Sequence, residues 1–553
     1  MFPFAIAFGS STSTVNQDLK PTRAAISTAD PIATAVGMKV LAEGGNAFDA
    51  AVAITSTLAV VEPAGSGLGG GGFFLLYLAE TDEYRFVDAR EIAPKAAYRD
   101  MYLDDQGKPI PRASVDGPLA AGIPGIPAGL VYLNNQFGSM PLSDLLAPAI
   151  EFAENGFSIG SRAIRGLNFR TNAILRSSAM SEVFLPDGEV PEEGTVIFQP
   201  ALAKTLKRFS NQGLDGFYKG ETASLLVNGV RAAGGIWTLD DLADYEVIER
   251  QPLVAKYKNM RVISAPLPSS GGIVISQILD FLSAYNLEEL TEAQRIHYEV
   301  EAMRRAYRDR ALYLGDDDFS EIPLDKLLDK RYLAEQRASF KLDQASSSIN
   351  LFSEDDQRAE GNQTTHFSVL DSRGNRVAAT ITVNTWYGSA FMAPETGVIL
   401  NNEMDDFSIK PGVPNDFGLV GGRANEVVPG KRPLSSMSPS FLESDRGIAI
   451  LGTPGGSRII TMVLRSALHW YQGGSAEEMV NLKRYHHQYL PDRIEYELGS
   501  ISKEAQAELL GMGHQLSLAR RPFGNMNVVT WDYSNGKVTA ASDSRGEGEG
   551  RVY

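Results

Sequence analysis

The sequence contains no cysteine, which excludes disulfide bonds, thiolate metal ligands and a cysteine nucleophile. Positive charge is also in short supply: 51 lysines and arginines stand against 68 aspartates and glutamates, a formal net charge of −17. A chain this acidic argues against binding to nucleic acid or to an anionic membrane, because phosphates need clustered basic side chains. No apolar run reaches the ~18 to 20 residues of a membrane-spanning helix.

Histidine is scarce too, and its six copies form no metal-binding motif such as H-E-x-x-H. His486 and His487 are adjacent, so on a strand they would point to opposite faces and could not bind one ion together. The G-x-S-x-G motif of many serine hydrolases is absent as well. We therefore expect no metal ion and no other cofactor. His366 is a candidate base because it lies two residues from Thr364, and a structural role is the alternative.

The chain is long and apolar enough for a large core, with 553 residues of which 43% are hydrophobic. Amphipathic patterns predict helices at 27–61 (two, divided at "EGGN" with Asn46 as N-cap), 141–157, 201–209, 292–314 and 458–473. Apolar alternation predicts a hairpin after the glycines at 69–72 and strands at 366–384, 396–401, 439–453 and 526–542. Helices and strands in separate blocks predict a layered α+β fold rather than alternating βαβ units.

A glycine-rich segment, "GSGLGG" at 65–70, satisfies the G-x-G-x-x-G pattern of dinucleotide-binding proteins. That pattern has meaning between a strand and a helix, whereas here a helical segment precedes it and a strand-like segment follows. We therefore reject a dinucleotide site. The glycines instead allow the backbone to pass very close to another segment, either as a tight turn or as one wall of a site.

The segment "GNQTTHFS" at 361–368 places two threonines between a polar stretch, residues 340–363, and an alternating apolar run. The polar stretch has the composition of an exposed connector. A threonine hydroxyl is a weak nucleophile, but an N-terminal threonine carries its own base, an α-amino group that titrates near ~8. Thr364 could thus become a nucleophile if the chain were cut after Gln363. The alternative is an ordinary polar strand start.

Nine segments of the chain carry a resemblance to one enzyme family. In chain order they are "VVEPAGSGLGGGGF", "FVDAREIAP", "PLPSSGG", "TTHFSV", "TITVNTWYG", "GVILNNEMDDFSIKPGVPNDFGLVGG", "KRPLSSMSPS", "LGTPGGSRII" and "YHHQYLPD". Together they resemble the γ-glutamyltranspeptidase (glutathione hydrolase) family of N-terminal-nucleophile enzymes. The resemblance runs from about Ala24 to the C-terminus, and nine long motifs in family order make it specific.

The resemblance implies a four-layer αββα sandwich of the N-terminal-nucleophile hydrolase type, and a precursor that cuts itself between Gln363 and Thr364. Residues 21–363 would form the large subunit and residues 364–553 the small subunit, which together make one αββα domain and a heterodimer. Residues 1–20 would be a signal-peptide remnant or a disordered lead-in of a periplasmic or secreted protein. The implied partners are glutathione, other γ-glutamyl compounds and amino-acid or dipeptide acceptors.

The resemblance also implies catalytic roles for particular residues. Thr364 would attack the γ-carbonyl of a glutamyl substrate and form an ester that water or an amine resolves. Thr382 would hydrogen-bond this nucleophile, and the backbone N–H groups of Gly455 and Gly456 would stabilise the oxyanion. Thr365 would face away from Thr364 on the strand and would serve positioning or maturation.

Further residues would recognise the substrate, again by resemblance. Its α-carboxylate would be bound by Arg90, Ser435 and Ser436. A salt bridge to Asp88 or Glu91 is the structural alternative for Arg90. The α-ammonium would be bound by Asn384, Glu403 and Asp406, although an acidic run of this kind can also be a solvated turn. Phe417 would lie in a lid loop, at a position where bacterial relatives often carry tyrosine.

Two other hypotheses stay open. The same scaffold could serve an acylase that acts on glutaryl amides such as cephalosporin side chains. A glutaryl chain has no amine, so the predicted ammonium-binding residues favour the glutamyl substrate. The chain could also be a binding or structural protein without activity, but the complete set of predicted catalytic residues argues against that.

Overall fold

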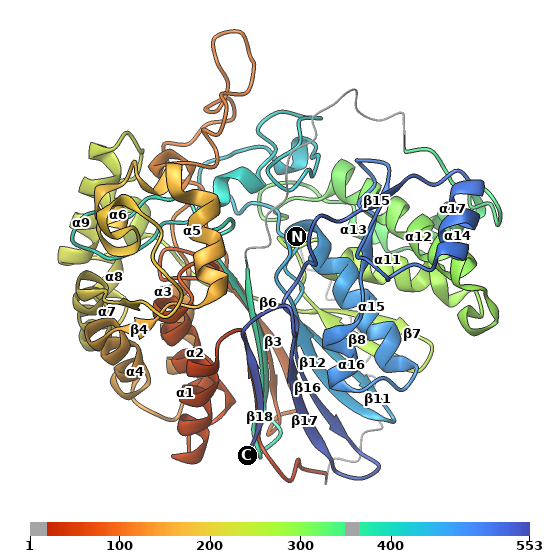
Figure 1. The fold of residues 1–553 in the computed structure, drawn as a ribbon, viewed down its shortest axis with the longest axis horizontal. Helices are drawn as coiled ribbons and strands as arrows, with labels where there is room; N and C mark the ends of the chain where they lie inside the picture. The colour runs from red at the N-terminus through yellow and green to blue at the C-terminus, as the bar shows by residue number, and fades with distance from the viewer. Residues whose placement is uncertain (1–18, 349–363) are drawn as a thin grey trace, which may run out of the picture.

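Two antiparallel β-sheets lie face to face at the centre of the protein in the computed structural model, which describes residues 19–348 and 364–553 (Figure 1). The first sheet has the strand order β18 (Glu549–Val552), β1 (Ala25–Thr28), β9 (Thr365–Leu370), β10 (Arg376–Thr382), β2 (Gly71–Leu78), β3 (Glu83–Ala89) and β6 (Ile248–Arg250). The second has the order β17 (Val538–Ser542), β16 (Asn527–Asp532), β12 (Gly447–Gly452), β11 (Ser440–Ser444), β8 (Met260–Ser264) and β7 (Leu253–Tyr257).

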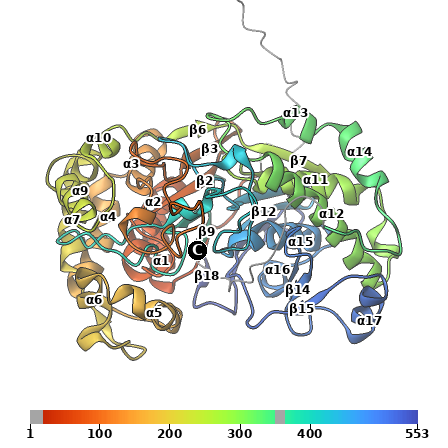
Figure 2. The ribbon, with the colours of Figure 1, turned by 90° about the horizontal axis from the view of Figure 1, so that it is seen from above.

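Helices cover the outer face of each sheet, and the view from above separates the two helical layers (Figure 2). The layer on the first sheet contains α1 (Pro31–Ala42), α2 (Ala47–Val61), α3 (Ile126–Phe137), α4 (Leu142–Asn155), α5 (Ser161–Ile174), α6 (Ser178–Phe184), α7 (Pro200–Gln212), α8 (Asp215–Tyr218), α9 (Gly220–Ala232) and α10 (Leu239–Ala243). The layer on the second sheet contains α11 (Gly271–Ser283), α12 (Glu292–Tyr313), α15 (Ile459–Tyr471), α16 (Ala476–Asn481) and α17 (Lys503–Gly511).

Smaller elements lie outside these four layers. They are α13 (Leu324–Leu327), α14 (Lys330–Ala338), a two-stranded sheet of β4 (Phe157–Ser158) and β5 (Val196–Ile197), and a three-stranded sheet of β13 (Tyr485–His486), β14 (Ile494–Tyr496) and β15 (Leu516–Leu518). Among the described residues, none of the helices has both the length and the apolarity needed to cross a membrane.

The strands at the centre of the first sheet are buried on both faces, which explains their continuous apolar sequence. In β2, Phe74 and Leu76 pack into the core below the first helical layer. Phe73 and Leu75 pack into the other core, which also contains the second sheet and its helices. Because side chains alternate along a strand, both sets must be apolar. This four-layer arrangement confirms the predicted α+β fold and the hairpin that β2 and β3 form.

Local sequence signals located most helix boundaries correctly. Asn46 caps α2 and forms a reciprocal capping box with Asp49, and the predicted helices at 141–157, 201–209, 292–314 and 458–473 correspond to α4, α7, α12 and α15. The strand predicted at 396–401 is wrong. Its backbone forms isolated bridges from Ile399 to Met392 and from Leu400 to Gly69, because the chain crosses the end of the sheet there instead of extending it.

Strands from both ends of the chain alternate in the first sheet. β9 and β10, which follow residues 349–363, lie between β1 and β2, which precede them. Residues 1–18 and 349–363, and with them the predicted lead-in and Gln363, lie outside the described part of the chain. Thr364 is described and directly precedes β9 in the middle of the sheet.

Candidate active site

Thr364 and Thr382 meet at one end of the first sheet, where β9 begins and β10 ends. Their Oγ1 atoms are 3.3 Å apart, and both residues are buried. The backbone N–H of Asn384 donates to Thr382 Oγ1 at 2.8 Å, which holds that hydroxyl toward Thr364. The structure thus brings together the two threonines that the sequence assigned to the nucleophile and its hydrogen-bonding partner.

The glycine-rich segment lets the chain pass directly against Thr382. A Cβ atom on Gly70 would lie 1.9 Å from the Thr382 carbonyl oxygen, and one on Gly69 would lie 2.0 Å from the Ile399 carbonyl oxygen. Since contacts that short do not occur, larger residues would push these segments apart. α2 precedes the segment and β2 follows it, so the strand–helix context of a dinucleotide site is absent, and the glycines form one wall of the threonine site.

A small pocket opens beside the two threonines. It is lined by Arg90, Thr364, Thr382, Asn384, Glu403, Asp406, Phe417, Leu419, Ser435, Ser436, Met437, Gly456, Ser457 and Ile459. These residues include the predicted site residues other than Gly455, which directly precedes Gly456, and Gln363, which lies outside the described residues. The free volume of about 20 Å³ holds about one water molecule. A ligand the size of an amino acid therefore requires side chains or a loop to move.

Arg90 pairs inside this pocket with two of the predicted ammonium-binding residues. Its guanidinium contacts Glu403, and its Nη2 donates to Asp406 Oδ2 at 2.6 Å. Glu91 lies farther away, with its Oε2 3.7 Å from Arg90 Nη1, and Asp88 accepts the backbone N–H of Arg90 at 2.9 Å. Buried charges of both signs thus lie together beside the pocket, as a zwitterionic ligand would require.

Burial raises the pKa of Glu91, Glu403 and Asp406. Desolvation places the pKa of Glu403 well above its usual range, raises that of Asp406, and brings that of Glu91 to about 7, although Arg90 opposes each shift. The attraction to one arginine is therefore weaker than the cost of burying three carboxylates.

Phe417, which the sequence predicts to lie in a lid loop, lines the pocket. A Cβ atom on Gly456 would be 2.4 Å from the Phe417 ring, so the ring packs directly on that glycine. Asn415 ties the lid to the ion cluster, because its Nδ2 donates to Asp406 Oδ1 at 3.3 Å while its Oδ1 accepts the N–H of Phe417 at 3.0 Å. Gln488 adds a bond from its Nε2 to the Phe417 carbonyl oxygen at 3.3 Å.

Two residues that line the pocket, Asn384 and Gly456, have an uncommon backbone conformation. Asn384 has a φ of 75° and Gly456 a φ of 55°, both in the left-handed region. Asn384 Nδ2 donates to the Asn402 carbonyl oxygen at 2.9 Å, so its orientation is set by the protein. A side chain at Gly456 would add conformational strain to the collision with the lid.

A network on the opposite side of β9 holds Thr364 and Thr365. Glu62, at the end of α2, accepts a short hydrogen bond from the Thr365 hydroxyl and a 2.9 Å bond from Arg162 Nε. Arg162, on α5, also reaches the Thr364 carbonyl oxygen at 3.4 Å and lies 4.9 Å from the Trp386 ring. Thr365 therefore faces away from Thr364, as predicted. The sequence analysis assigned no role to Glu62 or Arg162, although Glu62 lies in the "VVEPAGSGLGGGGF" segment at 60–73.

His366 lies in the sheet and forms a structural contact. Its Nδ1 is 2.9 Å from Thr380 Oγ1 and its Nε2 is 3.2 Å from Ser368 Oγ. Complete burial lowers the pKa of His366 to about 3. The side chain is thus a neutral, fully hydrogen-bonded part of the core, which favours the structural alternative over a base for Thr364.

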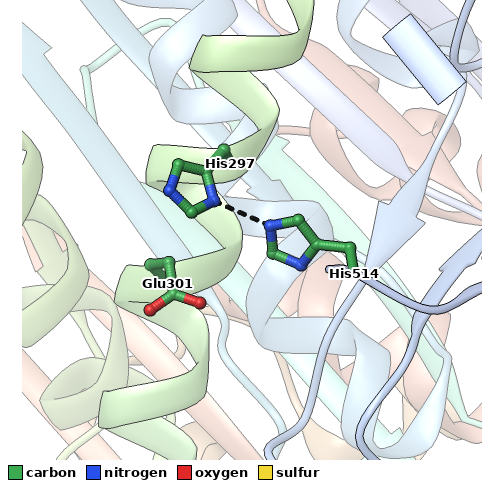
Figure 3. A group of neighbouring side chains, drawn as sticks. All are labelled: His297, Glu301 and His514. Atoms are coloured by element: carbon green, nitrogen blue, oxygen red, sulfur yellow. Dashed lines mark hydrogen bonds between the residues drawn. The ribbon is translucent and has the colours of Figure 1, made fainter. Parts of the chain in front are cut away.

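Two groups of possible metal ligands occur among the described residues, the adjacent Asp316, Asp317 and Asp318 and the group of His297, Glu301 and His514 (Figure 3). His297 Nδ1 lies 2.7 Å from His514 Nε2, and His297 Nε2 lies 2.8 Å from the Lys341 carbonyl oxygen. Glu301 is bound by Arg305 Nη1 at 2.6 Å and by neighbouring arginine and serine groups. These internal bonds tie the chain just before residue 349 to α12, so we interpret the second group as an anchor.

Comparison with known proteins identifies the family of the chain. A sequence model of the gamma-glutamyltranspeptidase family matches residues 33–553. The "glutathione hydrolase proenzyme" of Pseudomonas sp. strain A14 is 43% identical over 495 residues, which are 89% of this chain and 86% of that protein.

Two solved structures extend the comparison to the fold. The cephalosporin acylase of Bacillus halodurans superposes with a TM-score of 0.83 at 22% identity, covering 100% of this chain and 98% of its own, and at that identity it shows the fold alone. The gamma-glutamyltranspeptidase of Helicobacter pylori gives a TM-score of 0.56 at 42% identity, over 57% of this chain and 91% of the solved chain. With its αββα sandwich of the N-terminal-nucleophile hydrolase type, the chain belongs to the gamma-glutamyltranspeptidase family.

Proposed function

We propose that the protein is a γ-glutamyltransferase and glutathione hydrolase that matures by cutting itself between Gln363 and Thr364. Family membership and the name of the Pseudomonas relative support this proposal. The observation that carries it is the pair of buried threonines, 3.3 Å apart, beside a buried cluster of both charge signs. The pair suits a nucleophile, and the cluster suits the two charges on the α-carbon of a γ-glutamyl group.

Maturation would use the Thr364 hydroxyl first against its own chain. Its oxygen attacks the Gln363 carbonyl carbon, the peptide C–N bond breaks, and the proton from the hydroxyl ends on the new amine. Water then hydrolyses the ester, which leaves a carboxylate on Gln363 and restores the hydroxyl. Thr364 now has a free α-amino group that titrates near ~8 and can serve as its base. Residues 21–363 would be the large subunit, residues 364–553 the small one, and residues 1–20 a lead-in.

The mature enzyme would transfer a γ-glutamyl group in two steps. The Thr364 amine takes the hydroxyl proton as the oxygen attacks the γ-carbonyl, and the same proton passes to the leaving amine of glutathione or another γ-glutamyl compound. Water, an amino acid or a dipeptide then attacks the ester, giving ping-pong kinetics. The backbone N–H groups of Gly455 and Gly456 would stabilise the oxyanion, and Thr382 would orient the nucleophile.

Substrate recognition would proceed by exchange of ion pairs. The substrate ammonium replaces Arg90 beside Glu403 and Asp406, with the amide oxygen of Asn384 as a further acceptor. The α-carboxylate takes over the freed Arg90, together with Ser435 and Ser436. Because the closed pocket has room for about one water molecule, the Phe417 lid must open first. We also propose, from family habit, that the protein acts in the periplasm or outside the cell.

Two measurements test these proposals separately. A denaturing gel with N-terminal sequencing of the smaller fragment should show a start at Thr364, and a persistent single chain would contradict self-cleavage. Wild-type enzyme should hydrolyse γ-glutamyl p-nitroanilide faster than glutaryl p-nitroanilide, whereas the reverse preference would identify the glutaryl acylase. Thr364→Ala should abolish both cleavage and turnover, and any retained turnover would exclude Thr364 as the nucleophile.

A further inference from the structure

Arg310, near the end of α12, is a buried arginine behind the pocket that has no carboxylate partner. Its Nη2 donates to Ser436 Oγ at 3.3 Å and its Nε donates to Ser270 Oγ at 3.0 Å. Among the residues that the structure describes, none forms an ion pair with it. Burial lowers the pKa of Arg310, but arginine keeps its charge in proteins. Among the described residues, a buried cation without a salt-bridge partner therefore lies directly behind Ser436.

The two serine hydroxyls in front of Arg310 are set up as hydrogen-bond donors. Ser436 Oγ accepts from Arg310, and Ser435 Oγ accepts from the Met437 N–H at 3.1 Å. Within the described residues, neither hydroxyl passes its own proton to an acceptor. A hydroxyl that already accepts a bond keeps its proton for another group. Because both serines line the pocket, two O–H donors backed by a cation face the ligand space, an arrangement that fits a carboxylate.

Arg90 by itself does not make the pocket attractive to an anion. It is paired with Glu403 and Asp406, so its guanidinium is already occupied by two carboxyl groups. Arg310 adds a second positive charge to the cluster, and Asp406 interacts electrostatically with it. The cluster is then matched to a group that brings one positive and one negative charge, such as the α-carbon of a γ-glutamyl substrate.

We infer that Arg310 determines specificity: through the Ser436 hydroxyl it supplies the positive charge that selects acyl groups bearing an α-carboxylate. The inference rests on the proposed γ-glutamyl function and deepens it. Arg310 acts through a serine, so it is a positioning residue rather than a catalytic one. Ser270 of the "PLPSSGG" segment orients it, because Ser270 Oγ accepts from Arg310 and donates to the Ser435 carbonyl oxygen at 2.8 Å.

The test uses mature enzyme and three p-nitroanilides that differ in their charges. The γ-glutamyl compound carries both charges, the glutaryl compound only the carboxylate, and the 4-aminobutanoyl compound only the ammonium. Arg310→Gln should lower kcat/KM for the first two by about 10- to 100-fold, mainly through KM, as expected for losing a hydrogen bond to a charged group. The 4-aminobutanoyl compound should change by less than about 3-fold, because it lacks the carboxylate that the bond supports.

Matched variants separate specificity from folding. Arg308→Gln, two residues away on the same helix and outside the pocket, should leave the ratios between the three substrates unchanged. If Arg310→Gln does not mature, Arg310→Lys keeps the charge and should retain the preference for γ-glutamyl over 4-aminobutanoyl. Equal losses of kcat/KM for all three substrates, in Arg310→Gln or in Arg310→Lys, would overturn the inference. Failure of the wild type to use γ-glutamyl p-nitroanilide would instead refute the proposed function, and the inference with it.

Discussion

At the scale of single residues, the site depends on hydroxyl and backbone groups whose positions are set by their neighbours. Thr382 receives the Asn384 N–H and presents its oxygen to Thr364. Gly456 leaves room for the Phe417 ring. A substitution that adds or removes one small group at Thr382 or Gly456 should therefore change the reaction rate more than the free energy of unfolding.

Removing the Thr382 hydroxyl should slow the reaction without unfolding the protein. We expect Thr382→Val to reduce kcat about 10- to 100-fold, because the nucleophile loses one hydrogen-bond partner in a buried site. Steady-state kinetics with a γ-glutamyl anilide measures this. Thr380→Val on the same strand removes a hydroxyl that bonds to His366, and it should cost stability while kcat stays within a few-fold. Equal kcat losses in both variants would contradict a specific role for Thr382.

Adding a methyl group at Gly456 should displace the lid. The new Cβ would lie 2.4 Å from Phe417, so Gly456→Ala should raise KM several-fold as the ring is pushed out of its position. Phe417→Ala makes room for that methyl, and the double variant should recover part of the loss relative to Gly456→Ala. The absence of any recovery in this double-mutant cycle would show that the lid collision is not the cause.

At the scale of elements, strand β9 is held from behind by helices α2 and α5. Glu62 and Arg162 form a buried pair that binds the Thr365 hydroxyl and reaches the Thr364 carbonyl. Losing one member leaves the other charge buried, which costs about 3 to 5 kcal/mol. The start of β9 should loosen as a result.

Arg162→Gln should accordingly slow self-cleavage and lower kcat together. Time courses on denaturing gels and kinetics of the purified mature fraction give the two readouts. Arg165→Gln changes an exposed residue on the same helix and should behave like the wild type. Normal cleavage and normal kcat in Arg162→Gln would exclude the positioning role.

At the scale of the whole molecule, segments on either side of residues 349–363 build one sheet. β9 and β10 pair with β1 and β2 along their lengths, so cutting the chain before Thr364 removes no strand pairing. Both parts also contribute to both cores. Neither part can keep its apolar faces buried without the other.

The two fragments should therefore stay together after cleavage. Size-exclusion chromatography in native buffer should show one species that resolves into two bands only on a denaturing gel. The same protein in urea should lose activity and fragment association in one transition, because both depend on the shared sheet. Dissociation of active fragments on simple dilution would contradict this.

Buried neutral histidines should make the whole fold sensitive to acid. Desolvation lowers the pKa of His366, His486 and His514 to about 3 and that of His487 to about 4. In the unfolded chain a histidine titrates near ~6.5, so it binds a proton at pH values at which the buried histidine stays neutral. The free energy of unfolding therefore decreases as the pH falls below ~6.5. Each such histidine contributes up to about 1.4 kcal/mol per pH unit.

Urea unfolding at pH 7 and pH 5 measures this dependence. His514→Gln removes one titrating group and should reduce the loss of stability between the two pH values, even if the variant is less stable at pH 7. An unchanged pH slope would mean that His514 is accessible to protons in the folded state.

The sequence by itself determined the parts that depend on neighbours along the chain. The apolar alternation of β2, the Asn46 cap and the glycines before β2 are local signals, and the motif around Thr364 predicted the nucleophile. Only the tertiary structure decided which partners the buried charged side chains contact. Arg90 and Glu403 are 313 residues apart, Arg162 and Thr364 are 202 apart, and Arg310 and Ser436 are 126 apart. A buried charge is stabilised or left unbalanced by whatever the packed layers place beside it, and that depends on the fold rather than on the local pattern.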